Sequence, residues 1–211
     1  MKLTLPARKN IFKTTWEDSL DLYYTPLIKD VYLHRFELAV SLIKGKQYES
    51  LLDIGFGCGI FLKELSLHTK LLYGIDIHEN INKVRHTVQK EDFRAELKSG
   101  SILSIPYESQ KFQCVMAMSI LEHLTELDKA MSEIGRIACA NADIILGFPV
   151  KNLITDSFFR SLGYSPNKIH PSTHQSILKA IRRHFKIVKI IKYPQFFPPN
   201  LGLYLVVKCQ K

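Results

Sequence analysis

The chain has 211 residues, of which 46% are hydrophobic and 23% charged, a composition typical of a globular protein long enough to bury one core. No apolar run approaches the roughly 18–20 residues that a membrane-spanning helix needs, and the first ten residues turn polar too soon for a secretory signal. The formal net charge of +9 favours an anionic partner, although lysine-rich solvated surfaces alone also produce such a charge.

Short apolar runs alternate with longer amphipathic segments from residue 50 onwards. Residues 1–45 precede the first run, and we expect them to form an N-terminal helical cap on a domain made by residues 46–211. The expected strands lie at 50–54, 71–77, 95–98, 112–120 and 142–149, and the expected helices at 60–67, 80–90 and 125–139. This alternation predicts a parallel sheet with crossover helices on both faces.

The C-terminal part of the chain breaks this alternation. Ser172 and Gln175 are spaced as a capping box, which predicts the start of another helix. Two apolar runs follow, at 186–192 and 203–208, and the connection between them is too short for a crossover helix. We therefore expect them to pair antiparallel and to bring the sheet to seven strands.

Four cysteines are scattered along the chain without a C-x-x-C pair: Cys58, Cys114, Cys139 and Cys209. This spacing argues against a zinc site and favours reduced thiols. We therefore expect a cytoplasmic protein without a bound metal.

Three glycines, Gly55, Gly57 and Gly59, directly follow the first strand and its Asp53. Glycine lets the backbone turn sharply and lets a ligand approach without a Cβ in the way. Asp76 ends the next strand, about 20 residues further on, where an acid can accept hydrogen bonds from ribose hydroxyls. Ile60 breaks the dinucleotide fingerprint, and the P-loop ending is missing, so we expect a ligand with a ribose that need not carry a pyrophosphate.

The stretch LLDIGFGCGIFLKEL resembles the first motif of class I S-adenosylmethionine-dependent methyltransferases, in particular the small type 11 group. LLYGIDIHE resembles the second motif, and SGSILSIPYESQKFQCVMAMSILEHL resembles the stretch that follows. The resemblance covers residues 50–150 well and the rest of the chain only in strand count. It implies an α/β, Rossmann-like sheet in the order 3-2-1-4-5-7-6 with its last strand antiparallel.

The resemblance also implies roles for single residues. Asp53 and the backbone of 55–59 would hold the methionine part of S-adenosylmethionine, unless Asp53 only braces the loop. Asp76 would bind the ribose, and Ile77 would pack on the adenine. The remaining cofactor contacts would come from Ser101, Ile102 and Ser119. Ser101 and Ile102 fall in the adenine loop, where the family usually has an aspartate in place of Ser101, and Ser119 ends the fourth strand near the reactive sulfur.

The sequence says less about the residues that would bind the methyl acceptor. His170 and His174 lie in the segment after the fifth strand, where this family builds acceptor sites, and they are the candidate bases. The alternative for each is a surface or capping role, which is the commoner one for a histidine, and for His123 in LEHL it is a structural hydrogen bond. Arg35 is either a partner for the cofactor's carboxylate or a solvated residue on a helix face.

Signatures of nucleic-acid methylation are missing after the fourth strand, where Asn/Asp-Pro-Pro-Tyr or Pro-Cys would stand. We therefore expect methyl transfer to a small molecule, with an anionic or lipid-linked acceptor as the sharper hypothesis, and no nucleic-acid partner. The alternatives are a non-catalytic binding or regulatory subunit and an RNA methyltransferase. A nicotinamide-dependent oxidoreductase is disfavoured by Ile60.

Overall fold

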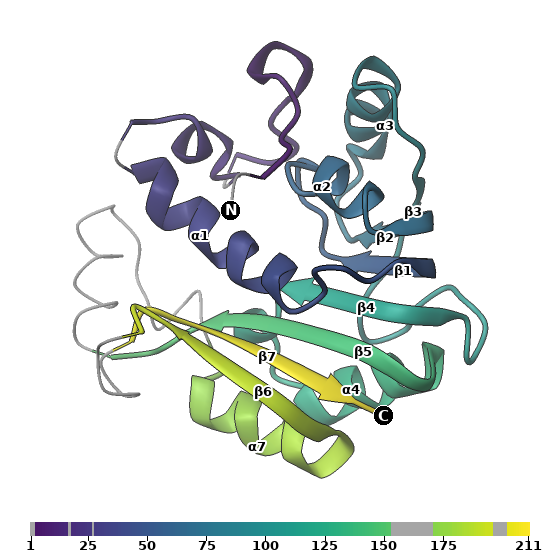
Figure 1. Ribbon diagram of the computed structural model, residues 1–211, viewed down its shortest axis with the longest axis vertical. Helices are drawn as coiled ribbons and strands as arrows, with labels where there is room; N and C mark the ends of the chain where they lie inside the picture. The colour runs from purple at the N-terminus through teal and green to yellow at the C-terminus, as the bar shows by residue number, and fades with distance from the viewer. Residues whose placement is uncertain (1–2, 17, 27, 153–170, 196–201) are drawn as a thin grey trace.

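The computed structural model describes residues 3–16, 18–26, 28–152, 171–195 and 202–211. Within them the strands form one seven-stranded sheet in the order β3-β2-β1-β4-β5-β7-β6 (Figure 1). β1 to β5 are parallel, and β7 runs antiparallel to both β5 and β6. The expected sheet order and the antiparallel terminal pair are confirmed. The strands are β1 (Tyr48–Ile54), β2 (Thr69–Asp76), β3 (Glu96–Ser99), β4 (Phe112–Met118), β5 (Ala138–Pro149), β6 (Lys186–Tyr193) and β7 (Tyr204–Gln210).

Helices cover both faces of the sheet, as Figure 1 shows. The α-helices are α1 (Ile28–Ser41), α2 (Leu62–Ser66), α3 (Ile81–Lys90), α4 (Leu127–Ile137) and α7 (His174–His184). Short 3-10 turns add η1 (Arg8–Asn10), η2 (Leu20–Tyr23) and η3 (Leu121–His123). One hydrophobic cluster joins α1, α2 and α3 to one face of the sheet, and a second cluster joins α4 and α7 to the other.

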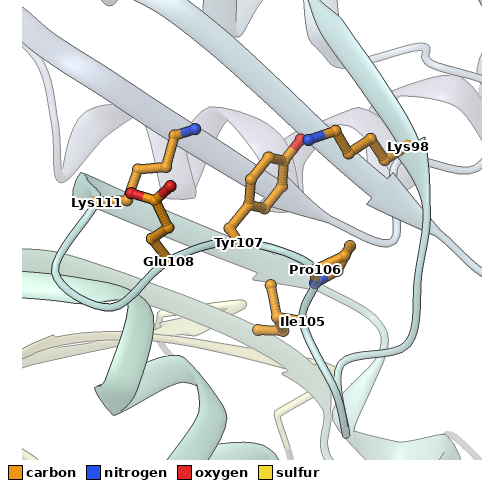
Figure 2. Close-up of a pocket in the computed structure, with 6 residues that line it drawn as sticks. All are labelled: Lys98, Ile105, Pro106, Tyr107, Glu108 and Lys111. Atoms are coloured by element: carbon orange, nitrogen blue, oxygen red, sulfur yellow. The ribbon is translucent and has the colours of Figure 1, made fainter.

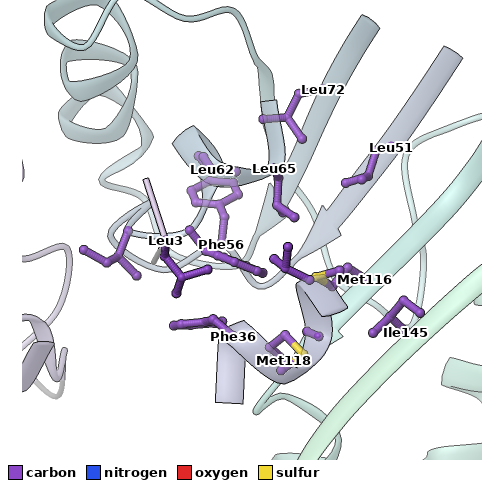
Figure 3. Packing of buried hydrophobic residues seen from close by; sticks show 14 of the residues in the cluster. Leu3, Phe36, Leu51, Phe56, Leu62, Leu65, Leu72, Met116, Met118 and Ile145 are labelled. Atoms are coloured by element: carbon purple, nitrogen blue, oxygen red, sulfur yellow. The ribbon is translucent and has the colours of Figure 1, made fainter. Parts of the chain in front are cut away.

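The apolar runs of the central strands follow from this two-sided burial. In β1, Leu51 belongs to the cluster on the α1 face, whereas the next residue, Leu52, belongs to the cluster on the α4 face. Ile144 and Ile145 divide in the same way in β5. Figure 3 shows the first cluster from close by, with Leu51, Met116 and Ile145 of the sheet near Phe36 of α1. A strand buried on both faces has no polar side, so its sequence is continuously apolar.

The N-cap of α7 differs from the expected capping box. Thr173 is the N-cap, with extended backbone angles, and its hydroxyl accepts a hydrogen bond from the Ser176 amide at 3.2 Å. The expected cap, Ser172, instead donates its hydroxyl to the carbonyl of Leu124 at 2.5 Å. The prediction was wrong by one residue because the tertiary contact to the loop after η3 takes up the Ser172 side chain.

A buried ionic group ties the end of the first helical segment to the sheet. The carboxylate of Asp143 in β5, only 2% exposed, accepts hydrogen bonds from Tyr48 Oη and Lys46 Nζ, both at 2.5 Å. Lys208 Nζ of β7 lies 3.0 Å from the same carboxylate and also donates to the carbonyl of Leu42 at the end of α1. The contacts therefore connect β1, β5 and β7 with the chain that leaves α1.

We expect Asp143→Asn to lower the free energy of unfolding by about 3–5 kcal/mol, because it leaves the buried Lys208 ammonium without a counter-charge. The measurement is urea-induced unfolding followed by circular dichroism. The matched control is Lys46→Gln, which removes the more exposed partner and should cost less than about 1 kcal/mol. Equal losses of unfolding free energy for Asp143→Asn and Lys46→Gln would contradict this prediction.

Candidate functional site

The loop after β1 contains the three glycines of the motif, all with positive φ: 77° at Gly55, 55° at Gly57 and 80° at Gly59. A Cβ at Gly55 would collide with the Ile120 side chain, so that glycine is required by packing. A Cβ at Gly57 would meet no atom within 4 Å. The loop is therefore open at Gly57, on the side from which a ligand can reach the backbone.

Asp76 at the end of β2 is bound to this loop. The Gly57 amide donates to Asp76 Oδ2 at 2.7 Å, and the His78 amide donates to Oδ1 at 3.2 Å. His78 Nε2 donates in turn to the Gly57 carbonyl at 2.9 Å. Gly57, Asp76 and His78 thus form a closed strand-end corner. Sequence analysis missed His78, which lies two residues after Asp76.

Asp53 lies directly before the loop, in β1 between β2 and β4. The residue is buried, and this burial, with the nearby charge of Asp76, raises the pKa of its carboxyl to about 7. A cation near Asp53 would favour the ionised form and would compensate its burial. The environment suits a positively charged ligand group.

The two residues expected to contact an adenine differ in exposure. Ile77 is 77% exposed and follows Asp76 directly, which leaves its side chain available for a flat ring. Ile102 is buried in the cluster on the α4 face, so a ligand contact there would use its backbone. Ser101 Oγ accepts from the Leu103 amide at 3.1 Å within a tight turn.

Ser119 ends β4 with a φ of 59° and is held from two sides. Its hydroxyl accepts a hydrogen bond from Arg35 Nη1 at 2.9 Å and shares a second with Tyr204 Oη at 2.8 Å. Arg35 also donates Nη2 to the Tyr23 hydroxyl. The segment before the sheet therefore reaches the carboxyl end of β4 through one guanidinium.

Arg35 is surrounded by aromatic rings rather than by solvent. Its guanidinium carbon lies 5.0 to 5.9 Å from the ring centroids of Phe36, Tyr32, Tyr23 and Tyr204. Its Nε is buried and has no hydrogen-bond partner among the described residues. No carboxylate of the described residues forms an ion pair with this half-buried cation, and an anionic ligand group would complete it.

Glu122, in η3, is a second buried group that sequence analysis did not single out. The residue is 3% exposed, and its Oε2 has no partner among the described residues. Burial raises the pKa of this carboxyl to about 8, opposed by the positive charge of Arg35. Glu122 is therefore mostly protonated at neutral pH.

The two candidate bases lie in different situations. His170 falls outside the described residues. His174 begins α7, where its Nδ1 accepts a hydrogen bond from the Lys151 amide at 3.2 Å and burial lowers its pKa. Only Nε2 of His174 is therefore left for another partner, and a role for either histidine stays a prediction.

A hollow of about 360 Å³ is lined by Lys98 of β3, by residues 105–108 and by Lys111, which directly precedes β4 (Figure 2). Lys98 and Lys111 place their ammonium groups 4.3 and 4.8 Å from the ring centroid of Tyr107. Pro106 of this lining lies against Gly100, whose amide donates to the Asp76 carbonyl, so the hollow borders the loop that contains Ser101 and Ile102.

Comparison with known proteins matches residues 52–146 to the family model of the methyltransferase domain, type 11. The match begins in β1 and ends in β5, so it contains the glycine loop, Asp76 and Ser119. The resemblance seen in the sequence motifs is confirmed.

Two curated relatives share 27% identity with the chain. One is the 24-methylenesterol C-methyltransferase 2 of Arabidopsis thaliana, over 137 residues, 61% of this chain and 37% of the relative. The other is the ubiquinone biosynthesis O-methyltransferase of Coxiella burnetii, over 101 residues, 47% of this chain and 42% of the relative. The chain thus spans about two fifths of the length of these relatives.

A solved structure with the same fold is the N-methyltransferase NodS from Bradyrhizobium japonicum, in complex with S-adenosyl-L-homocysteine. It superposes with a TM-score of 0.67 at 16% identity, over 94% of each chain. The likeness extends the shared fold beyond the segment matched by the family. No helix in the described segments is long and apolar enough to cross a membrane.

We expect Glu122→Gln to stabilise the fold increasingly as the pH rises from 5.5 to 8.5. The folded-state pKa of about 8 exceeds the ordinary 4.5, so the folded protein binds the extra proton and loses stability as the pH rises between the two values. The amide cannot ionise and avoids this loss, which is of the order of 1–3 kcal/mol. Thermal unfolding of the parent and the variant at both pH values measures this loss. A stability difference between them that does not change with pH would contradict the prediction.

Proposed function

We propose that this protein is an S-adenosylmethionine-dependent methyltransferase that acts on a small-molecule acceptor. The observation that carries the proposal is the strand-end corner, in which an open glycine loop and Asp76 are fixed together at the carboxyl ends of β1 and β2. This is the edge where open α/β sheets bind ligands, next to the point where the strand order reverses between β1 and β4.

The described residues fit S-adenosylmethionine along its length. Asp76 would accept hydrogen bonds from the ribose hydroxyls, and the exposed Ile77 would pack on the adenine. Asp53 and the loop backbone would hold the amino-acid part, where an ammonium group favours the ionised carboxyl. Arg35 would pair with the carboxylate, which supplies the anion that its buried guanidinium lacks.

When bound, this cofactor supplies a methyl group on a positively charged sulfur, which is already activated for displacement. The residues of the chain then have two tasks: they hold the acceptor in line and exclude water. A base is needed only for an acceptor that must lose a proton. For that case His170 and His174 remain the proposed candidates.

The proposed acceptor is a small molecule with an anionic or lipid-like character. The names of the curated relatives refer to a sterol and to ubiquinone biosynthesis, which support a lipid-like acceptor. The missing nucleic-acid signatures after β4 point the same way. A cytoplasmic location is part of the same proposal.

We expect S-adenosylmethionine and its demethylated product to bind with dissociation constants in the micromolar range. Asp76→Ala should weaken binding about 5- to 150-fold, a loss of about 1–3 kcal/mol, because the ribose loses a charged acceptor and the loop loses its anchor at Gly57. Isothermal titration calorimetry measures both, with the exposed Asp30→Ala as the control. Tight binding of NADH without binding of S-adenosylmethionine would overturn the proposal.

We expect Arg35→Gln to weaken binding of S-adenosyl-L-homocysteine about 10- to 100-fold, the strength of a charged hydrogen bond. Binding of 5′-methylthioadenosine, which lacks the carboxylate, should change less than about threefold. Calorimetry with both ligands separates a carboxylate contact from a general disturbance of the cleft. Equal weakening of the two ligands would assign Arg35 a structural role only.

A further inference from the structure

The positive charge of the chain is concentrated at its C-terminal end. Residues 157–211 contain ten lysines and arginines and no aspartate or glutamate. Residues 1–156 contain the remaining 19 basic residues and all 20 acidic ones, so they are almost neutral. A charge asymmetry of this size between two parts of one chain indicates a surface for an anionic partner.

In the described structure most of this charge lies on α7 and β6, which are neighbours at one end of the sheet (Figure 1), while Lys208 of β7 is buried against Asp143. Four basic side chains are exposed there: Lys179, Arg182, Lys186 and Lys189. Arg183 differs, because its guanidinium binds both carboxylate oxygens of Asp128 at 2.6 Å. We call the four exposed basic residues, together with Val188 and Ile190, the α7–β6 face.

The edge strand β6 also exposes apolar side chains. Ile190 is paired with Val207 and points to the side of α7, whereas Lys189 is paired with Lys208 and points to the side of α1. Val188 is 50% exposed and Ile190 42%. The ladder with β7 shifts register between Ile187 and Lys189, so Val188 falls at the irregularity. Two branched aliphatic side chains held in water at the sheet edge lower the free energy when they enter an apolar phase.

A second copy of this chain is a poor occupant of the edge. β6 pairs only with β7 among the described strands, so its outer backbone is open to another strand. Pairing of two β6 edges would bring Lys186 and Lys189 of both copies together. Edge lysines are a common means by which proteins prevent such pairing.

We propose that the α7–β6 face docks on an anionic lipid membrane. Exposed basic side chains on α7 and β6, together with exposed aliphatic ones on the same edge strand, match a surface with anionic headgroups above an apolar interior. Nucleic acid fits less well, because its bases call for exposed aromatic side chains to stack on and the face as defined has none. The inference goes beyond the proposed methyl transfer and does not depend on it.

The face also leads to the candidate site. β6 ends at Tyr193, which is paired with Tyr204, and Tyr204 in turn contacts the hydroxyl of Ser119. The Tyr193 ring lies 4.4 Å from that of His34 in α1. β6 therefore extends from the exposed lysines at its amino end to the carboxyl ends of β4 and β5, where the candidate site lies.

The test is co-sedimentation of the full chain with vesicles of phosphatidylcholine alone or with 30% phosphatidylglycerol, at 50, 150 and 500 mM NaCl. We expect binding to the anionic vesicles only, with a loss at high salt. Each basic residue removed should lower the partition coefficient about fivefold. The partition coefficient of the variant K179Q/R182Q/K186Q/K189Q should therefore fall at least about 100-fold, and that of Ile190→Ser about fivefold.

The matched control is K29Q/K44Q/K70Q/K90Q, which removes the same charge from exposed lysines elsewhere. Its partition coefficient should fall less than about fivefold. Circular dichroism and S-adenosyl-L-homocysteine binding show that each variant is folded. Equal losses in the two quadruple variants, no binding to anionic vesicles, or tighter binding to a 20-nucleotide RNA would overturn the proposal. A parent that binds vesicles but no cofactor would refute the proposed function and leave the docking face intact.

Discussion

The hydrogen bond from the Gly57 amide to Asp76 holds the candidate site together. It joins the loop after β1 to the end of β2, two segments that come from neighbouring parallel strands. His78 donates a hydrogen bond to the Gly57 carbonyl, so both the amide and the carbonyl group of Gly57 have partners before a ligand binds. A ligand then meets backbone and carboxylate groups already in position, which reduces the ordering cost of binding.

Buried charge is handled in two different ways in this fold. Asp143 is surrounded by Lys46, Tyr48 and Lys208, and its charge is balanced by side chains of the fold. Arg35 has hydroxyl and aromatic neighbours but no carboxylate in contact, and its Nε is unpartnered among the described residues. The first arrangement stabilises the connection from α1 to the sheet, and the second is the kind expected of a binding residue.

The net charge also differs between two parts of the sheet. The part that carries the strand-end corner is nearly neutral, whereas the part that carries α7 and β6 is strongly basic. The corner lies at β1 and β2, whereas β6 is the edge strand on the far side of β4, β5 and β7, so the two regions are separated within one sheet. Ser119 and Tyr204 lie between them and connect β4 with β7.

Much of the fold could be predicted from the sequence because its signals are local. The uninterrupted apolar runs, the alternation with amphipathic segments and the short link between the last two strands determined the seven strands and the direction of β6 and β7. The glycine spacing and the position of Asp76 are also local signals, and they predicted which edge of the sheet carries the candidate site. The N-cap at Thr173 was missed by one residue, because a contact with Leu124 decided the role of Ser172.

The properties of single side chains were decided only by the tertiary structure. Arg35 is compatible with a solvated helix face in the sequence, and it is residues from η2, β4 and β7 that enclose it. Glu122 and His78 gave no signal of their own, because burial and an unpartnered oxygen depend on segments far apart in the chain. By itself the sequence determined which strands form and where they turn, since periodicity and glycine act locally, while the environment of each charge depended on long-range packing.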